Sequence, residues 1–523
     1  EEKFVRRMRD LLYEHIIRLP LSWHGANMTG DIIQRCTSDV DTVRRFLAEQ
    51  LTNLVRITVL IILAICFMVR INPILTVFAV MLVPVIIGYS TYFYTKISDQ
   101  FEKVDTMEGR LSAMVQENLT GVRVVRAFGR ERYEKDRFEA YNEKYINSWV
   151  KLMRLLTQFW ATGDLSGGLQ ALIIFGVGTY MCVKGNLTAG EYIAFVSYNA
   201  MMIWPVRMLG RMISEMGKAG ISIDRIRYIM NSDEEDGMRK DEIVTADMTD
   251  TDGENTDADY RKILSGDIVF EGVSFEYPNS SGGSETITDV SFTIPAGSTV
   301  GIIGGTGSGK STLMYLLDRL FDVDDGKGKI TIGGVDIREI PRSVLRSYIG
   351  IVLQEPYLFS GTLAENISIT TQEMVMSEVT DAVRTAALTE TVEKFSKGYD
   401  TYVGERGVTL SGGQKQRTAI AQMLIRKTPI QIFDDSLSAV DADTDRQIRA
   451  ALREKEDGAT TIIIAHRIST LMHADRIFVI DEGRLSESGT HDELVALGGI
   501  YAKVYDLQNA AIEKLSTGAN GAE

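Results

Sequence analysis

The glycine-rich stretch from Gly304 to Thr312 constrains the fold of this chain more than any other part of its sequence. It reads G-G-T-G-S-G-K-S-T and matches the phosphate-loop pattern G-x-x-x-x-G-K-[ST]. An apolar run, 298–303, precedes it, and apolar residues at helical spacing, 311–320, follow it. Strand, glycine loop and helix in this order predict a phosphate site, because backbone N–H groups and the helix start both attract an anion. The alternative is a glycine-rich turn without function.

Two residues of this stretch have side chains suited to a nucleotide. Lys310 is placed to reach the β- and γ-phosphates, and the Ser311 hydroxyl is placed to ligate Mg²⁺. The expected cofactors are therefore ATP and Mg²⁺.

Length, charge and cysteine content narrow the class of protein. A chain of 523 residues is long enough for more than one domain. Its net charge of −15 argues against a general nucleic-acid binder, so no nucleic-acid partner is expected. The sequence begins at Glu1 without a recognisable signal peptide, and we expect a fragment whose natural beginning is missing. The cysteines are too few for a disulfide framework or a metal cluster, and they are Cys36, Cys66 and Cys182.

The first half of the chain contains four stretches that we expect to be membrane-spanning helices. A span needs about 20 mostly apolar residues, and the second and third candidates meet this alone, whereas the fourth needs its flanks to continue the helix. Short connections at 70–73 and 184–191 predict two tight hairpins. The four stretches are 51–69, 74–94, 165–183 and 192–206.

The long connection at 95–154 is charged and helical in pattern. We expect one helix to run out into water, a turn near 117–131, and a helix that returns. Its arginines favour the cytoplasmic side, where ATP is found, and an even number of crossings places residues 1–50 and 211 onward there too. The expected location is a cell membrane, crossed several times, with the nucleotide-binding part in the cytoplasm.

A composition change marks the domain boundary. Residues 231–259 are dominated by Asp, Glu, Thr, Asn and Gly, which predicts a disordered or loosely attached linker without a function of its own. The expected organisation is an α-helical transmembrane bundle followed by an α/β phosphate-loop ATPase domain. The boundaries are 1–230 for the membrane domain, 231–265 for the acidic linker, 266–510 for the ATPase domain and 511–523 for a tail.

Three apolar runs in the second half end at polar residues. Such residues lie at the carboxyl edge of a parallel sheet, where α/β proteins bind ligands. Tyr277, roughly thirty residues before the glycine loop, is either a core aromatic or a platform for adenine. The runs and the residues after them are 349–353 with Gln354, 430–433 with Asp434 and Asp435, and 461–465 with His466.

The second half carries a set of motifs in a fixed order: Tyr277, the glycine loop at 304–312, Gln354, L-S-G-G-Q at 410–414, the strand that ends at Asp434, residues 438–441, and His466. In this order, the motifs resemble those of an ABC transporter. The five-residue signature separates this family from other phosphate-loop NTPases. Residues 29–35 and 117–131 resemble regions near the coupling helices of exporters with a fused membrane domain. An exporter half has six membrane helices, so the resemblance implies that four are present and the first two are missing. In the terms used for this family, the glycine loop is the Walker A loop, L-S-G-G-Q at 410–414 is the signature, the strand with Asp434 is Walker B, and residues 438–441 are the D-loop.

The resemblance implies a role for each motif. Tyr277 stacks on adenine, and Ser311, Gln354 and Asp434 arrange Mg²⁺ and its waters. The signature caps the nucleotide of a second subunit, so two chains enclose two ATP molecules. The implied catalytic residues are Asp435, His466 and Gln354. The nucleotide-binding residues also include Gly304, Gly305, Thr306, Gly307, Ser308, Gly309, Lys310, Ser311, Thr312, Ser411, Gly412, Gly413, Gln414 and Asp441.

One position departs from the family pattern. After Asp434 the family usually has Glu, which polarises the attacking water, and here Asp435 occupies that position. The missing methylene withdraws the carboxylate by roughly 1.5 Å, whereas a general base must come within about 2.6–3.2 Å of its target. We therefore predict a weakly hydrolytic site, similar to that of the degenerate-site subunit of heterodimeric multidrug exporters, with a partner that carries the catalytic Glu. A backbone shift or an extra water that restores hydrolysis is the alternative.

The predicted function is ATP-driven export of amphipathic drugs, lipids or peptides across the lipid bilayer by alternating access. The alternatives are an ATP-binding regulatory subunit, a homodimeric lipid or peptide exporter, and a soluble ABC ATPase, which the apolar stretches contradict. Asp164 and Arg56, near the membrane, are either substrate contacts or, alternatively, intra-bundle pairs and interfacial anchors.

Overall fold

The structure, a computed structural model, describes residues 2–235, 253–278, 285–404, 407–437, 442–454 and 458–519. These residues form two compact units. The helical unit contains the chain up to Ile17 and Met28–Ser232, and the α/β unit contains Arg18–Asn27 and the chain from Asp233 onward.

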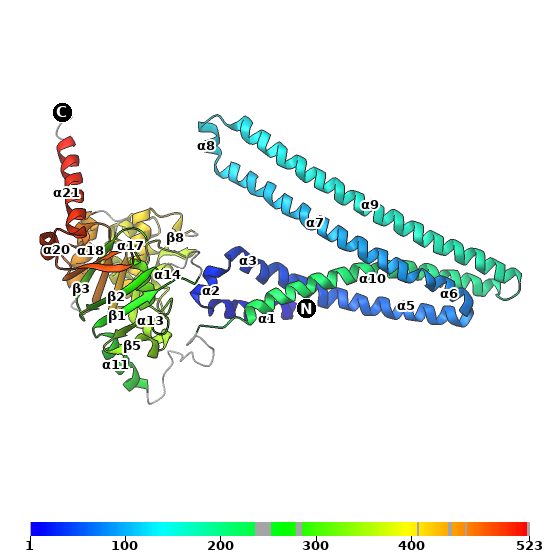
Figure 1. The fold of residues 1–523 in the computed structure, drawn as a ribbon, viewed down its shortest axis with the longest axis horizontal. Coiled ribbons are helices and arrows are strands. Elements are labelled where there is room, and N and C mark those ends of the chain that lie inside the picture. The colour runs from blue at the N-terminus through cyan, green and yellow to red at the C-terminus, as the bar shows by residue number, and fades with distance from the viewer. Residues whose placement is uncertain are drawn as a thin grey trace. The chain divides into compact units, whose positions relative to one another are not determined.

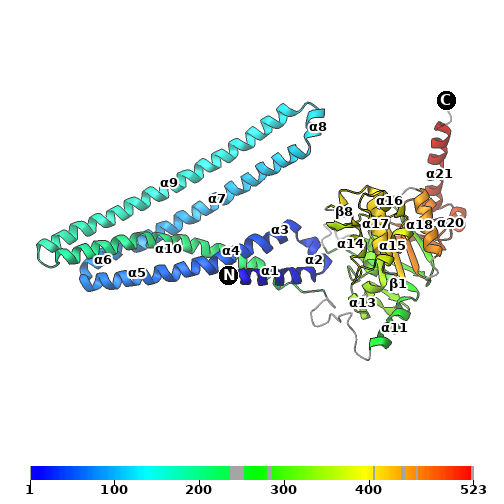
Figure 2. The same cartoon turned by 180° about the vertical axis from the view of Figure 1, so that it is seen from behind.

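The helical unit consists of long helices, because its apolar stretches continue into charged helical segments without a break. Helix α7 runs out of the second apolar stretch, the short α8 makes the turn, and α9 returns alongside α7 (Figure 1, Figure 2). The expected helix–turn–helix at 95–154 is confirmed. The helices are α1 (Glu2–Ile17), α3 (Thr29–Gln34), α4 (Val40–Arg45), α5 (Leu51–Ile71), α6 (Pro73–Met81), α7 (Val83–Thr120), α8 (Val122–Ala127), α9 (Glu131–Val183) and α10 (Ala189–Met230).

Capping residues set both tight hairpins. The Asn72 side chain accepts the Leu75 N–H at 3.0 Å, and Pro73 at the first helical position has the backbone angle that a helix start needs. At the second hairpin, Thr188 and Glu191 form a reciprocal capping box. The short connections predicted from the sequence are therefore confirmed.

Three helical stretches of the described chain are long and apolar enough to cross a membrane. They are Thr29–Ile71, Pro73–Thr120 and Glu131–Val183, and they contain the first three predicted spans. The fourth predicted span, 192–206, lies in α10, which packs against α5, α7 and α9 but is not one of the three. That crossing stays a prediction.

The α/β unit is built on a six-stranded sheet with the order β12-β11-β3-β10-β9-β6. All of its neighbouring pairs are parallel except β11 with β12. A second, antiparallel sheet has the order β2-β1-β4-β5. The strands are β1 (Ile268–Phe275), β2 (Ile287–Ile294), β3 (Thr299–Gly304), β4 (Lys329–Ile332), β5 (Val335–Asp336), β6 (Ile349–Val352), β7 (Gly361–Thr362), β8 (Tyr402–Val403), β9 (Ile430–Asp434), β10 (Thr460–Ile464), β11 (Arg476–Asp481) and β12 (Arg484–Gly489).

Helices surround these sheets and close two hydrophobic cores. One core lies between α12, the antiparallel sheet and one face of the six-stranded sheet, and the other joins α14, α15 and α17 to the opposite face. The helices of this unit are α2 (Leu21–Ala26), α11 (Gly253–Leu264), α12 (Lys310–Leu317), α13 (Arg342–Tyr348), α14 (Leu363–Ser368), α15 (Met376–Thr385), α16 (Thr389–Lys394), α17 (Gly412–Leu424), α18 (Ala442–Glu454), α19 (Ile468–Leu471), α20 (His491–Leu497) and α21 (Ile500–Ala519).

The disordered or loosely attached linker predicted over 231–259 stays a prediction, because residues 236–252 lie outside the described part of the chain, and contacts are seen only on either side of them. Helix α11 begins at Gly253, and its last residue, Leu264, is fully buried in a core of the α/β unit. At the other end, Glu235 is only 9% exposed and is held by hydrogen bonds. Composition alone gives no sign of either contact, because each depends on partners that are distant in the sequence.

Candidate nucleotide-binding site

Four adjacent parallel strands bring the predicted site residues to one edge of the sheet. Strands β3, β10, β9 and β6 lie side by side in this order. At their carboxyl ends the chain continues into the glycine loop, His466, the Asp434–Asp435 pair and Gln354 respectively. Gly304 and His466, which are 162 residues apart in the sequence, are thus brought to the same edge because parallel strands all end on the same side.

The glycine loop requires glycine at specific positions. Gly309 has φ +97°, and a Cβ there would lie 2.3 Å from the Ile287 side chain. A Cβ on Gly304 would lie 2.1 Å from the Ile480 carbonyl oxygen, which is backbone and cannot move aside cheaply. Any larger residue would therefore reshape the loop, which explains the motif in steric terms.

Lys310 lies at the start of α12 with its side chain folded over the loop. Its Nζ donates to the carbonyl oxygens of Gly304 at 3.0 Å and Gly305 at 2.7 Å. Burial lowers the pKa of this ammonium, and the charges of Asp434 and Asp435 partly oppose that shift. The positive charge is thus held inside the loop, where a phosphate would gain most from it.

The Walker B aspartate fits a divalent cation. Asp434 is 2% exposed, and its Oδ1 accepts a hydrogen bond from Ser311 Oγ at 3.0 Å. Within the described residues, its Oδ2 is buried without a hydrogen-bond partner. Burial raises the pKa of Asp434, and the bond from Ser311 opposes this shift. A buried carboxylate oxygen without a donor beside a hydroxyl is the oxygen-rich setting that Mg²⁺ prefers, so these two residues fit the ion.

The proposed Mg²⁺ site would not be formed by protein side chains alone. Among the described residues no group of three or more His, Cys, Asp or Glu side chains could hold a metal ion. Mg²⁺ in nucleotide sites is usually held by one or two side chains plus phosphates and water, which matches Ser311 and Asp434.

Asp435 adopts an unusual backbone conformation. Its φ is +46°, in the left-handed region, and its N–H donates to the Ile464 carbonyl at 3.0 Å. The Gln354 side-chain amide donates to Asp435 Oδ2 at 3.4 Å. The carboxylate therefore lies beside the residue that the family pattern assigns to Mg²⁺ and its waters.

Tyr277 is tied to the phosphate loop by its hydroxyl, which lies 3.0 Å from Thr312 Oγ1. Its ring meets Phe275 and Phe321 edge-on, with centroid distances of 5.0 and 5.1 Å. These nearly perpendicular contacts fix the plane of the ring. Phe321 carries no motif in the sequence, so only this contact identifies it.

The signature residues form the start of α17. Ser411 and Gln414 make a capping box, in which the Ser411 N–H donates to Gln414 Oε1 at 2.9 Å. Ser411 and Gly412 are exposed, and Gly413 is half-buried. An exposed helix start with N–H groups pointing outward can receive an anion from outside the chain.

Of the two remaining predicted site residues, the structure describes His466 but not Asp441. His466 is exposed, and its backbone carbonyl accepts a hydrogen bond from Gln508 Nε2 at 2.8 Å, while its charge helps to lower the pKa of Asp434 against the larger effect of burial. Asp441 and the rest of the D-loop lie outside the described residues.

The structure also shows the surroundings of Asp164 and Arg56, the two charged residues predicted to lie near the membrane. Asp164 accepts a hydrogen bond from Arg207 Nη1 at 2.9 Å, and the Arg207 guanidinium is buried against Gly163, where a side chain would clash. The intra-bundle alternative is therefore the one observed for Asp164. Arg56 is exposed on α5.

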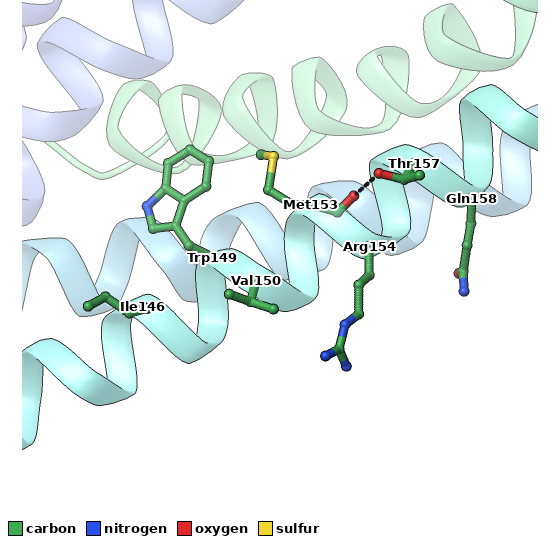
Figure 3. Close-up of a pocket in the computed structure, with 7 residues that line it drawn as sticks. All are labelled: Ile146, Trp149, Val150, Met153, Arg154, Thr157 and Gln158. Atoms are coloured by element: carbon green, nitrogen blue, oxygen red, sulfur yellow. Dashed lines mark hydrogen bonds between the residues drawn. The ribbon is translucent and has the colours of Figure 1, made fainter.

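A hollow of about 490 Å³ follows one face of α9 and is lined by Ile146, Trp149, Met153 and Arg154 among others (Figure 3). All of its lining residues come from this single helix, so it is a helix face and not an enclosed cavity. It offers no phosphate-binding loop and is separate from the nucleotide site.

A phosphate loop with a Walker B carboxylate, in one chain with long apolar helices, defines a membrane protein that uses a nucleoside triphosphate. Comparison with known proteins makes this specific. The ABC transporter transmembrane region matches residues 1–206, and the ABC transporter family matches residues 287–438. The chain belongs to the ABC transporter family, in the exporter arrangement that fuses membrane and ATPase domains. It is therefore an ATP-hydrolysing translocase that resides in a membrane.

Several bacterial relatives match over nearly the whole chain. YheI of Bacillus subtilis (strain 168), named a probable multidrug resistance ABC transporter ATP-binding/permease protein, is 36% identical over 504 residues, which cover 96% of this chain and 82% of YheI. The ATP-dependent lipid A-core flippase of Aromatoleum aromaticum is 31% identical over 506 residues, which cover 96% and 80%. A solved bacterial Atm1-family ABC exporter with ATP bound has a TM-score of 0.79 and 28% identity, with 97% of this chain and 85% of that chain covered.

Proposed function

We propose that this chain is one half of a heterodimeric exporter of amphipathic compounds, and that its own Walker A and Walker B motifs form a slowly hydrolysing ATP site. The single observation that carries this proposal is Asp435, a shortened acid at the position of the family's catalytic Glu. The partner would carry the full-length acid, and the L-S-G-G-Q signature of this chain would complete the partner's fast site.

The local backbone supports slow hydrolysis. A left-handed conformation costs a non-glycine residue roughly 1–2 kcal/mol, and the Asp435 N–H is held by the Ile464 carbonyl at 3.0 Å. The main chain therefore cannot easily shift to compensate for the missing methylene. The Gln354 amide also donates to Asp435 Oδ2 at 3.4 Å, so part of this carboxylate is engaged by a neighbouring side chain.

The remaining roles follow from the same geometry. Tyr277 would stack on adenine, and the loop with Lys310 would hold the phosphates. Ser311 and Asp434 would hold Mg²⁺, which neutralises phosphate charge when bound. The exposed Ser411 would cap the nucleotide of the partner subunit.

The substrate class is inferred from relatives. One is named a multidrug resistance transporter and another a lipid A-core flippase, and both kinds of cargo are amphipathic. The proposed cycle is alternating access, in which ATP closes two nucleotide-binding domains and the membrane helices respond by population shift.

The test is a comparison of two substitutions in the transporter reconstituted with its partner. Ser411→Ala should lower steady-state ATP turnover by about tenfold or more, because it touches the fast site. Asp435→Asn should change turnover by less than about twofold, because its own site contributes little. Asp443→Asn, an exposed acid on α18, is the matched control. Equal losses for Ser411→Ala and Asp435→Asn would contradict the asymmetry.

A second candidate, a regulatory subunit that binds ATP and gates a partner, is favoured by the same Asp435. Removing the partner's catalytic Glu separates the two, since a regulatory subunit would still open the partner's pathway on ATP binding. Rapid hydrolysis by this chain without a partner would instead favour the homodimeric exporter.

A further inference from the structure

A buried ion pair lies where the chain enters the α/β unit after helix α10. Glu235 is five residues beyond Met230, the last residue of α10, and is 9% exposed. Its carboxylate receives two parallel hydrogen bonds from Arg346, at 2.8 Å from Nη1 and 2.9 Å from Nη2. Arg342 Nη1 lies 3.6 Å from the same carboxylate. Such a bidentate contact fixes direction as well as distance.

Arg346 also holds the far end of the phosphate-loop helix. Its Nε donates to the Asp318 carbonyl at 3.2 Å, and its Nη2 donates to the Arg319 carbonyl at 2.6 Å. These carbonyls follow α12, whose first residue is the phosphate-binding Lys310. An eight-residue helix is about 12 Å long and moves as a rigid body. Arg346 thus connects Glu235 to the opposite end of the helix that begins at the phosphates.

Neighbouring arginines stiffen this connection. Arg319 donates to the carbonyls of Ile337 at 3.0 Å and Ile340 at 2.9 Å, and to Asp322 at 2.9 Å. Arg342, at 8% exposure, also bonds to Asp322. The end of α12 and helix α13 are therefore joined by several charged hydrogen bonds, so a displacement of α12 moves α13 with it.

Glu235 also joins two of the three places where the chain passes between its units. Its N–H donates to the Arg18 carbonyl at 2.8 Å, and Arg18 begins the segment that contains α2. A cavity of about 510 Å³ within the α/β unit is lined by Pro20 and Ser22 of this segment, by Glu235, and by Tyr277. The entering segment, the ion pair and the candidate adenine platform thus border one space.

We propose that Glu235 is a positioning residue that transmits nucleotide-dependent motion of α12 to helix α10 along the chain itself. The route runs from the phosphate loop through α12 to Arg346, then to Glu235, and from there through five residues to α10. It is separate from the route through the turn between α7 and α9. It rests on the membership of the ABC transporter family and not on the slow-site proposal, so it holds for a homodimer as well.

The experiment measures hydrogen exchange in the full transporter in nanodiscs, without nucleotide and with Mg²⁺, ATP and vanadate. In the wild type, nucleotide trapping should change the exchange of backbone amides in residues 206–230. In Glu235→Gln the size of this change should fall by about threefold or more. ATP affinity, measured by equilibrium binding, should stay within about twofold.

Two features separate positioning from a merely structural role. The nucleotide-dependent change at α8 should persist in Glu235→Gln, because that route does not use Glu235. Asp233→Asn, an exposed acid in the same segment, should behave as the wild type. If Glu235→Gln does not assemble, Arg346→Lys keeps the charge but loses the fork, and should reduce the α10 change in the same way.

An undiminished α10 response in Glu235→Gln or Arg346→Lys overturns the proposal. Parallel loss of the α8 and α10 responses also overturns it, since that result would show general damage to the α/β unit. The slow-site proposal is tested by turnover and not by exchange, so failure of one leaves the other standing.

Discussion

The two ends of helix α12 differ in the contacts that they make. At its start, Gly309 and Lys310 belong to the phosphate loop, and Lys310 Nζ donates to the carbonyl oxygens of Gly304 and Gly305. At its end, the carbonyls of Asp318 and Arg319 are already occupied by the Arg346 guanidinium, which is balanced by Glu235. The first end, which we call the ligand end, is where the predicted nucleotide would bind, and the second, the saturated end, is held by hydrogen bonds within the protein. We therefore expect substitutions at the two ends to have different effects on ATP binding and on stability.

The largest effect should come from the saturated end. Arg346→Ala leaves Glu235 as a buried charge without its bidentate partner, which should lower the free energy of unfolding by about 3 kcal/mol. Thermal unfolding of the α/β unit in the purified transporter measures this, while ATP affinity should change little. A variant that loses ATP affinity but not stability would reverse the distinction between the two ends.

The ligand end should show the opposite pattern. Lys310→Ala removes the ammonium inside the loop and should weaken ATP binding about 30-fold, equivalent to roughly 2 kcal/mol. The melting temperature without nucleotide should stay near that of the wild type. Lys503→Ala, an exposed lysine on α21, is the control and should bind ATP normally.

At the saturated end, stability should also depend on pH because of Asp318. Burial raises the pKa of Asp318 from 3.8 to about 7, against the opposing charges of Arg346 and Arg426. The folded state therefore binds a proton that the unfolded state releases, and this stabilisation is full below pH 3.8 and is lost as pH rises toward 7. Between these values the wild type should lose about 1 kcal/mol of stability per pH unit relative to Asp318→Asn. Parallel pH profiles of the two proteins would refute this.

The smallest expected effect is on ATP binding, in variants of Tyr277 next to the phosphate loop. Tyr277→Phe keeps the aromatic ring between Phe275 and Phe321 but removes the hydroxyl that lies 3.0 Å from Thr312. ATP binding should weaken by only about twofold to fivefold. Tyr277→Ala, which also removes the ring, should weaken it more, and equal losses would show that stacking on adenine contributes nothing.

The sequence alone predicted the residues at the ligand end, the ABC transporter family, and the hairpins of the membrane unit. These are predictable because each depends on neighbours along the chain. A phosphate loop uses the backbone of nine consecutive residues, an apolar span uses one continuous stretch, and a cap such as Thr188 acts within three residues. Even the meeting of Gln354, Asp434 and His466 follows from a general rule about parallel strands.

Only the tertiary structure revealed the saturated end. Glu235 and Arg346 are 111 residues apart and carry no motif, and the composition of 231–259 predicted a linker without function. The pair exists because the fold buries both groups together, where each would be costly alone. Likewise, the pairing of Asp164 with Arg207 depends on Gly163 leaving space for a guanidinium. The phosphate loop and the helix caps depend on consecutive residues and can therefore be predicted from the sequence. Whether a charged side chain is buried depends on all the residues that pack around it, which only the tertiary structure shows.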